Sequence, residues 1–362
     1  MTSDATAPTD LAVVDAALVS FVQHQRTRLD PLGPPLADLV DAAAAYVSGG
    51  KRLRPAFCLA GWRVATATPD DTPVPEAVAV AAGSLEWLQG SALVHDDLMD
   101  GSDTRRGRPS VHRDFEQRHR REAMVGDPAG FGAATAVLMG DLMLSWCDEM
   151  LRSAGHRPGP FTGADGAARL ARAFEVLDVC KTEVVAGQFL DVVNQTRPES
   201  SAAEAMLVVR YKAAKYTVER PLHLGATLGG GDQALMAGLS AVALPLGEAF
   251  QLRDDVLGVF GDPAVTGKPS GDDLREGKRT LLVARTAELG GEPARAVLRD
   301  ALGTDDGVPR IRDLIASSGA LASVEHEIDR LVVAARTALL ELPTGGRSTL
   351  EPLLARATDR TR

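Results

Sequence analysis

The sequence HDDLMDGSDTRRG, residues 95–107, places four carboxylates and two guanidiniums within eleven positions. The apolar run Ala92-Leu93-Val94 precedes it, and Gly101 interrupts it. Burying this many charges without compensation would cost much more free energy than a fold can supply. The stretch therefore lies on a solvated surface, or it holds a multivalent partner such as metal ions and phosphate.

The same stretch ends a long apolar pattern of helical period over residues 76–100. Comparable patterns predict helices over residues 11–29, 36–47, 53–64, 133–151, 167–193, 204–228 and 234–260, with three or four more in 280–358. We expect Asp10 to cap the first helix. Aromatic residues make up only 4% of the chain, and no segment alternates like a strand. These features predict an all-α protein with ten or more helices in one domain over residues 10–362, after a disordered segment 1–9.

Composition narrows the class of function. The net charge of -10 argues against nucleic acid as a partner, because such binding needs a basic surface. Cys58, Cys147 and Cys180 are scattered and have no zinc spacing, as expected for core thiols in a reducing compartment. We find no signal peptide and no apolar run of transmembrane length. The expected location is cytoplasmic, without a transmembrane segment.

A second acidic pair, Asp254-Asp255, lies 158 positions after Asp96 and also ends an apolar helical pattern. Asp96 and Asp100 are four residues apart and share one helix face, so a cation between them would relieve their repulsion. Oxygen ligands of this kind suit Mg²⁺. The position four after Asp254 is Gly258, so the second site has one carboxylate fewer.

Basic residues accompany the acidic clusters. This pattern in an acidic protein suits a small polyanion bound with metal, because arginine and lysine both match phosphate oxygens. The basic groups are Lys51-Arg52 with Arg54, Arg105-Arg106, Lys212 with Lys215, and Lys268 with Lys278-Arg279.

Four motifs in order resemble those of the trans-isoprenyl diphosphate (polyprenyl) synthases. Asp96-Asp97-Leu98-Met99-Asp100 with Arg105-Arg106-Gly107 resembles the first aspartate-rich motif of that family. The other three are Gly50-Lys51-Arg52-Leu53-Arg54-Pro55, Gly187-Gln188 with Asp191, and Gln251, Asp254-Asp255 with Gly267-Lys268-Pro269. Together they span residues 50–269, which is most of the chain.

The resemblance implies an isoprenoid-synthase-type helical bundle around a central cavity, a homodimer, and three Mg²⁺ ions. It implies a trans-prenyltransferase that condenses an allylic diphosphate with isopentenyl diphosphate head-to-tail. Asp96, Asp100 and Asp254 would bind the metal, and Asp97 and Asp255 would act through waters. The cations that would grip the allylic diphosphate are Arg105, Lys212, Lys268 and Lys278. Those that would grip isopentenyl diphosphate are Lys51, Arg54 and Arg106. The polar residues that would orient waters or shelter the carbocation are Gln188, Gln251 and Thr217.

The sequence departs from the family pattern at three positions. Gln89 replaces a histidine that often binds isopentenyl diphosphate, so binding should weaken. Gly258 replaces the third aspartate of the second motif, which matters little if that residue works through water. Ala213 follows Lys212 where the family has threonine, and Thr217, one helical turn on, is the candidate substitute.

Product length should be set along the helix that ends in the first cluster. Ser91 and Ala92 lie roughly 6–7.5 Å below the diphosphate site at the rise of an α-helix, and both are small enough for the product to pass. Leu88 and Trp87 are the next bulky residues below them. We expect geranylgeranyl diphosphate (C20), with longer chains next and farnesyl diphosphate (C15) third.

Two other functions stand as alternatives. A class I terpene cyclase also ionises a diphosphate with Mg²⁺, but it lacks the cations for isopentenyl diphosphate and carries a different second motif. A non-catalytic subunit that regulates a true synthase has no need of metal ligands, whereas this sequence keeps aspartates in both clusters.

Overall fold

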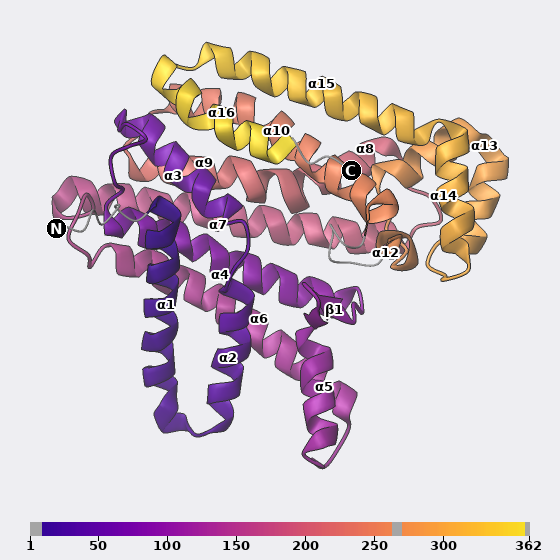
Figure 1. Ribbon diagram of the computed structural model, residues 1–362, viewed down its shortest axis with the longest axis horizontal. Coiled ribbons are helices and arrows are strands. Elements are labelled where there is room, and N and C mark those ends of the chain that lie inside the picture. Colours follow the sequence, from indigo (N-terminus) through magenta and orange to yellow (C-terminus); the bar gives the residue numbers. More distant parts are fainter. Residues whose placement is uncertain (1–8, 263–269, 359–362) are drawn as a thin grey trace, which may run out of the picture. The chain divides into compact units, whose positions relative to one another are not determined.

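The structure, a computed structural model, describes residues 9–262 and 270–358. Apart from one two-stranded hairpin, the regular elements of these residues are all helices, which confirms the all-α prediction with more than ten helices (Figure 1). The elements are α1 (Asp10–Leu29), the 3-10 turn η1 (Asp30–Leu32), α2 (Pro35–Val47), α3 (Leu53–Thr66), α4 (Glu76–Met99), β1 (Thr104–Arg105), β2 (Arg108–Pro109), α5 (Val111–Arg121), α6 (Pro128–Ala154), α7 (Gly163–Thr196), α8 (Ala202–Val208), the π-helix η2 (Val209–Glu219), α9 (Arg220–Leu228), α10 (Gln233–Phe260), α12 (Asp272–Arg275), α13 (Leu281–Ala301), α14 (Gly307–Ser318), α15 (Ala320–Glu341) and α16 (Thr344–Thr358).

The chain forms two compact units. The first comprises residues up to Asp103, Pro109–Leu177 and Pro221–Met236. The second comprises Thr104–Arg108, Asp178–Arg220 and the chain from Ala237 onward. Helices α7 and α10 contribute residues to both units. The expectation of a single domain stays a prediction.

The core of the first unit is built on α4 and α6, which lie side by side (Figure 1). Glycine allows the close approach, because a Cβ at Gly90 would lie 2.0 Å from the Cε of Met143. Beside this contact the Trp87 indole packs between Phe21 and Trp146, with ring centroids 5.5 and 5.0 Å away. Sixteen residues of α4 are buried, so its C-terminal end is held rigidly in place.

Helices α3 and α9 pack backbone to backbone in the same unit. A Cβ at Gly225 would lie 1.7 Å from the carbonyl oxygen of Cys58, and one at Gly61 would lie 2.1 Å from that of Leu222. Cys58 is fully buried, and burial raises the pKa of its thiol far above the ordinary value. The prediction of core thiols is confirmed, because all three cysteines are buried and none forms a disulfide.

The second unit has its own apolar core, formed by α8, α10 and the C-terminal helices α13 to α15. Leu252 and Val259 of α10 contribute to it, together with Ile311 and Ile315 of α14. Helix α13 bends at Gly291, which has a left-handed φ of 61°. This core buries the apolar face of α10 and fixes the end that carries the second aspartate pair.

Several element boundaries differ from the sequence predictions. Thr9, rather than Asp10, caps α1, because its hydroxyl accepts a hydrogen bond from the backbone N–H of Ala12. Helix α6 begins at Pro128, where the Asp127 carboxylate accepts from two backbone N–H groups. Helix α5 was not predicted, and the expected helix 204–228 contains an eleven-residue π-helix.

Three helices are long and apolar enough to cross a membrane, by length and composition only: α4, α6 and α10. The expectation that the sequence holds no such stretch was therefore wrong. Within the described residues, 83% of the relevant window of α4 is buried inside the protein, against 44% for α6 and 50% for α10. The apolar character of α4 is thus accounted for by the core it builds.

Candidate active site

The first aspartate cluster occupies the last turn of α4 and the residue that follows. Asp96 and Asp100 are partly buried, while Asp97 is only 1% exposed. Asp100 is the C-cap residue, and its N–H donates to the Asp96 carbonyl. Gly101 then takes a left-handed φ of 66° and ends the helix. The predicted pair at positions 96 and 100 therefore lies on a helix C-terminus, whose partial negative charge favours a bound cation.

Asp97 has surroundings unlike those of its neighbours. The hydroxyl of Tyr46 on α2 donates a hydrogen bond of 3.2 Å to its Oδ2. A carboxylate buried this deeply faces the protein rather than solvent. Its observed contact anchors the end of α4 to α2, while the water-mediated role predicted for it stays a prediction.

Arg105 and Arg106 lie in the hairpin that follows α4. Arg105 ends strand β1 and is partly buried, and Arg106 is exposed with a left-handed φ of 52°. At the base of this hairpin, Asp103 accepts from the Nε of Arg113 at 2.7 Å. The two predicted phosphate-binding arginines are thus held on a short, sharply turned segment.

The candidate chain-length residues lie where the sequence predicts, along α4. Ser91 is 3% exposed, Ala92 is partly buried, and Leu88 is 2% exposed. Trp87 belongs to the aromatic cluster with Phe21 and Trp146. Gln89, the residue in place of the family histidine, is partly buried on the same helix.

The cations of the basic loop between α2 and α3 differ in how deeply they are buried. Lys51 is exposed and Arg54 is partly buried in the first turn of α3, whereas Arg52 is 7% exposed. Of the three cations predicted for isopentenyl diphosphate, Lys51 and Arg54 thus belong to the first unit, whereas Arg106 belongs to the second. Arg52 belongs instead to the interior.

In the second unit, Lys212 lies on the π-helix η2 beside α7. Its Nζ contacts Oδ2 of Asp191 at 2.6 Å. Gly187 makes this approach possible, because a Cβ there would lie 2.3 Å from the backbone nitrogen of Lys212. Gln188, the next residue, is partly buried, and its Nε2 has no hydrogen-bond partner among the described residues. The Gly-Gln motif is thus the surface on which the lysine helix packs.

The π-helical register changes how Thr217 relates to its neighbours. The sequence predicts Thr217 one α-helical turn from Ala213, but η2 is a π-helix, whose hydrogen bonds run from i to i+5. Thr217 is five residues after Lys212, so the two residues have the spacing of one such bond. Thr217 is 3% exposed and lies in the interior of the helix packing.

The second aspartate pair lies in the last two turns of α10. Asp254 is partly buried, and Asp255 is 8% exposed and accepts a 2.8 Å hydrogen bond from Nε2 of Gln251. Burial, and then the negative charge of Asp273, raise the pKa of Asp255 to about 8, although the Gln251 hydrogen bond acts in the opposite direction. Burial thus disfavours the charged form of Asp255, whereas a neighbouring cation would favour it.

Gly258, the residue in place of a third aspartate, is covered by another carboxylate. A Cβ at this position would lie 2.2 Å from Oδ2 of Asp273 in α12. The N–H of Gly271 donates to the Gly258 carbonyl at 2.8 Å and holds α12 there. Lys278 follows, with its Nζ 3.5 Å from Asp273 and 2.6 Å from Glu276. Lys268 lies outside the described residues.

The available donors fit magnesium better than an all-protein metal cage. Among the described residues, no three His, Cys, Asp or Glu side chains converge on a metal position. The two aspartate clusters instead offer oxygen atoms in pairs at helix ends. Mg²⁺ is commonly bound by one or two carboxylates, waters and substrate phosphates, so this donor set suits it.

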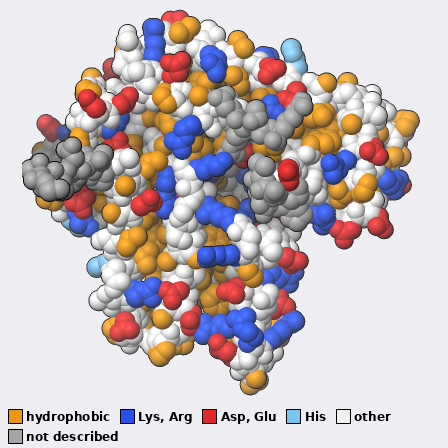
Figure 2. All heavy atoms as spheres, in the orientation of Figure 1, with side chains coloured by type: hydrophobic (Ala, Val, Ile, Leu, Met, Phe, Trp, Pro, Cys, Tyr) orange, Lys and Arg blue, Asp and Glu red, His pale blue; other side chains and the backbone are white. Residues whose placement is uncertain are grey.

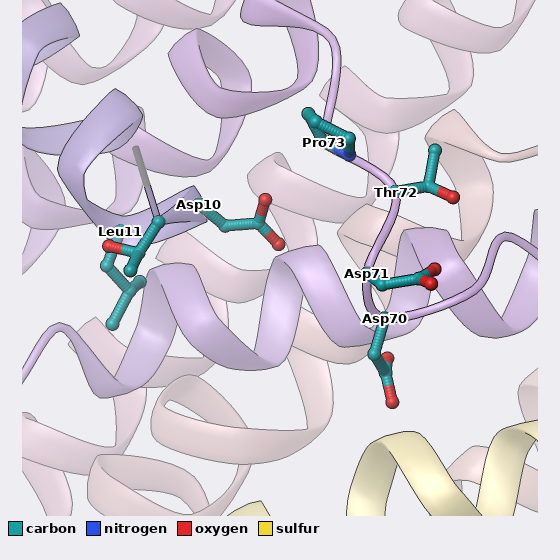
Figure 3. Close-up of a pocket in the computed structure, with 7 residues that line it drawn as sticks. Asp10, Leu11, Asp70, Asp71, Thr72 and Pro73 are labelled. Atoms are coloured by element: carbon teal, nitrogen blue, oxygen red, sulfur yellow. The ribbon is translucent and has the colours of Figure 1, made fainter. Parts of the chain in front are cut away.

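Two other polar features have structural explanations. A pocket lined by Asp10, Asp70 and Asp71 opens beside the N-terminus of α1 (Figure 3), but Arg63 binds the Asp10 carboxylate at 2.5 Å. Helix α5 is rich in arginine, and Figure 2 shows basic and acidic side chains intermixed over it. Its Arg118 pairs with Asp38 and with Glu122.

Comparison with known proteins decides the family. A family model described as polyprenyl synthetase matches residues 37–316, well over half of the 362 residues. The chain belongs to the polyprenyl synthetase family. It is therefore an enzyme, a trans-prenyl diphosphate synthase, and the family joins an allylic diphosphate to isopentenyl diphosphate.

The relatives of this prenyl synthase differ in product. It is 30% identical to a geranylfarnesyl diphosphate synthase of Aeropyrum pernix, over 82% of this chain and 85% of that protein. It is 33% identical to a (2E,6E)-farnesyl diphosphate synthase of Mycobacterium bovis, over 78% and 71%. A geranylgeranyl pyrophosphate synthase of Corynebacterium glutamicum, solved with isoprenyl diphosphate and magnesium, superposes with a TM-score of 0.88 at 38% identity, over 97% and 98%.

Sequence reasoning missed four contacts that organise the candidate site. They are Tyr46 with Asp97, Asp191 with Lys212, Asp273 over Gly258, and Arg52 with Glu86. Only the Asp191 contact had a signal in the sequence, since Asp191 follows the Gly-Gln pair by one helical turn. The others depend on helix packing.

Proposed function

We propose that this prenyl synthase makes geranylgeranyl diphosphate (C20) from an allylic diphosphate and isopentenyl diphosphate. The observation that carries the proposal is the pair of small residues on α4 just below the first aspartate cluster, the buried Ser91 and the partly buried Ala92. A bulky side chain at either position would block the path of the growing chain and end the product at a shorter length. The C20 product named for the Corynebacterium glutamicum protein, the solved relative described above, supports the same length.

The metal ligands in this proposal are Asp96, Asp100 and Asp254, which would hold three Mg²⁺ ions. Bound Mg²⁺ neutralises the charge that develops on the departing diphosphate. Two of the ligands are four residues apart at the C-terminus of α4, and the third is near the C-terminus of α10. Asp97 and Asp255 act behind them, one held by Tyr46 and the other by Gln251.

The cations in this proposal bind the two diphosphates. Arg105, Lys212, Lys268 and Lys278 grip the allylic diphosphate, and Lys51, Arg54 and Arg106 grip isopentenyl diphosphate. Cleavage of the allylic C–O bond leaves a carbocation, so these groups stabilise the leaving group where its charge develops. Gln188, Gln251 and Thr217 orient waters or shelter the cation, and Gln89 donates a neutral hydrogen bond to isopentenyl diphosphate.

We also propose that the active form is a cytoplasmic homodimer. Helix α6 carries apolar side chains on its surface: Phe131, Val137 and Leu138 are 37%, 45% and 64% exposed. Exposed apolar groups on one helix are suited to cover by a second copy of the chain. Light scattering at several protein concentrations tests this, and a monomer at all concentrations would contradict it.

The experiment that tests the function uses purified protein, Mg²⁺, labelled isopentenyl diphosphate and each allylic primer in turn. We expect a C20 product by mass spectrometry, and a C15 or C25 product would replace the proposed length. The variant Ser91→Phe should shorten the product, while Ser317→Phe, a solvent-exposed position on α14, should leave its length unchanged. An unchanged length for Ser91→Phe would remove this position from the product tunnel.

The same assay separates the two alternative functions. A class I terpene cyclase would convert the allylic diphosphate alone to a hydrocarbon or alcohol without consuming isopentenyl diphosphate. A regulatory subunit would give no product with any primer. The variant Asp254→Asn should lower kcat at least about 100-fold if Asp254 is a metal ligand, because the charge of the leaving group then lacks part of its stabilisation.

A further inference from the structure

Arg52 differs from the other two cations of its loop because its charge is used inside the protein. Its Nε donates to Oδ1 of Asp15 on α1 at 2.7 Å, and its Nη1 donates to Oε2 of Glu86 on α4 at 2.5 Å. The side chains of Arg52 and Glu86 are each only 6% exposed. All these residues belong to the first unit.

The backbone around Arg52 is sharply turned. Gly49 and Gly50 have φ values of 71° and 90°, and Arg52 has a φ of 48°. Glycine adopts this left-handed region freely, whereas a residue with a Cβ does so only when its surroundings hold it there. The loop joins α2 to α3 and carries Lys51. Its two glycines would otherwise leave Lys51 with many accessible positions.

The ion pair with Glu86 ties this loop to the helix that ends in the first aspartate cluster. Glu86 lies three residues before Gln89 and ten before Asp96 on α4. Its second oxygen, Oε1, is buried and has no hydrogen-bond partner among the described residues. A buried ion pair with an unsatisfied oxygen is a poor device for stability, because apolar side chains of the same volume stabilise a core as well or better. The presence of this ion pair is better explained by its geometric effect, which is to hold the loop against α4.

We propose that Arg52 and Glu86 are positioning residues of the isopentenyl diphosphate site, acting through Lys51 and Arg54. The inference rests on the proposed function, which assigns those two cations to isopentenyl diphosphate. The ion pair fixes them relative to α4 before the substrate binds. This preorganisation matters more here than with a histidine at position 89, because Gln89 adds no charge of its own.

The test replaces the ion pair with apolar side chains, as Arg52→Met with Glu86→Leu in one chain. This double variant should fold, since no charge is left buried alone. We expect the KM for isopentenyl diphosphate to rise at least about 10-fold, while the KM for the allylic diphosphate and the thermal midpoint change little. The single variant Arg52→Lys, which keeps a charge opposite Glu86, should recover part of the loss. If the double variant unfolds, Glu86→Gln is judged by the same criteria.

A matched control is Arg118→Met, which removes an arginine paired with Asp38 and Glu122 at the surface, and it should change neither KM. Calorimetric titration with isopentenyl diphosphate alone gives a reading that needs no turnover. Weaker binding by the double variant than by the parent protein supports the inference. The inference is overturned if the double variant binds isopentenyl diphosphate as tightly as the parent protein does, or if both KM values rise equally. It is also overturned if the parent protein itself does not bind isopentenyl diphosphate. Binding without turnover in the parent protein would instead contradict the proposed function.

Discussion

The contact between α7 and the π-helix leads to a quantitative prediction for Gly187→Ala. The added Cβ would lie 2.3 Å from the backbone nitrogen of Lys212, 2.5 Å from the carbonyl carbon of Tyr211 and 2.7 Å from the Cα of Lys212. These are backbone atoms and cannot rotate away. Ordinary contact begins at 3.4 Å, so the two helices must separate by about 1 Å.

That separation should affect both stability and catalysis. Overpacking of this kind typically costs about 1–3 kcal/mol, and the better helix propensity of alanine offsets up to about 1 kcal/mol. The 2.6 Å contact between Lys212 and Asp191 would open. A displacement of about 1 Å at a substrate-binding cation lowers kcat/KM by roughly 100-fold.

Chemical denaturation and steady-state kinetics measure the two effects of Gly187→Ala. The matched control is Gly345→Ala in α16, where an added Cβ meets nothing within 4 Å. The control should be neutral or slightly stabilising and should keep full activity. If Gly187→Ala stays within about threefold of the parent kcat/KM and within about 0.5 kcal/mol of its stability, the tight contact is not what holds Lys212.

Three further predictions concern other parts of the molecule. Gly258→Asp should destabilise the metal-free protein by about 1–3 kcal/mol, because its carboxylate would meet Asp273. In thermal unfolding, Mg²⁺ or the added substitution Asp273→Gly should restore part of the lost stability. An unchanged stability of Gly258→Asp would contradict the observed packing. Burial alone would raise the pKa of Glu183, but hydrogen bonds from Arg220 and Lys215 outweigh it and lower the pKa. Its contribution to stability is therefore present above the ordinary pKa of 4.5 and is lost as the pH falls below it, so Glu183→Gln should cost about 1–3 kcal/mol at pH 7 and much less near pH 3 in denaturant titrations. The Cys58 thiol, buried and with a raised pKa, should not react with a thiol reagent until the protein is unfolded, and labelling of the native protein would contradict its burial.

Helix ends that carry charge were predictable from the sequence. The apolar periodicity of α4 and α10 gave their C-termini to within one residue, and the aspartates lie in the last turns of these helices. The point where the apolar helical period stops can be read from neighbouring residues alone, so it indicates the helix end without knowledge of the fold. The polar helix α5 gave no such signal, because it buries only Val111, His112, Phe115 and His119.

Contacts between distant residues were not predictable. Arg52 and Glu86 are 34 positions apart, and nothing in the neighbourhood of either indicates that this arginine, rather than Lys51, is the buried one. The π-helix has no separate apolar pattern, because its residues read as one helix from 204 to 228. The approach of Asp273 to Gly258 depends on the path of the chain after α10.

The π-helix has a consequence for sequence variation in this family. A π-helical segment holds one more residue in each hydrogen-bonded loop than an α-helix does. Deletion of one residue between Lys212 and Thr217 would therefore let the backbone return to α-helical hydrogen bonding without breaking the helix. The fold would tolerate the loss, but the lysine would turn relative to Asp191. In this segment we therefore expect the length of the chain to matter more for the position of Lys212 than the identity of each residue.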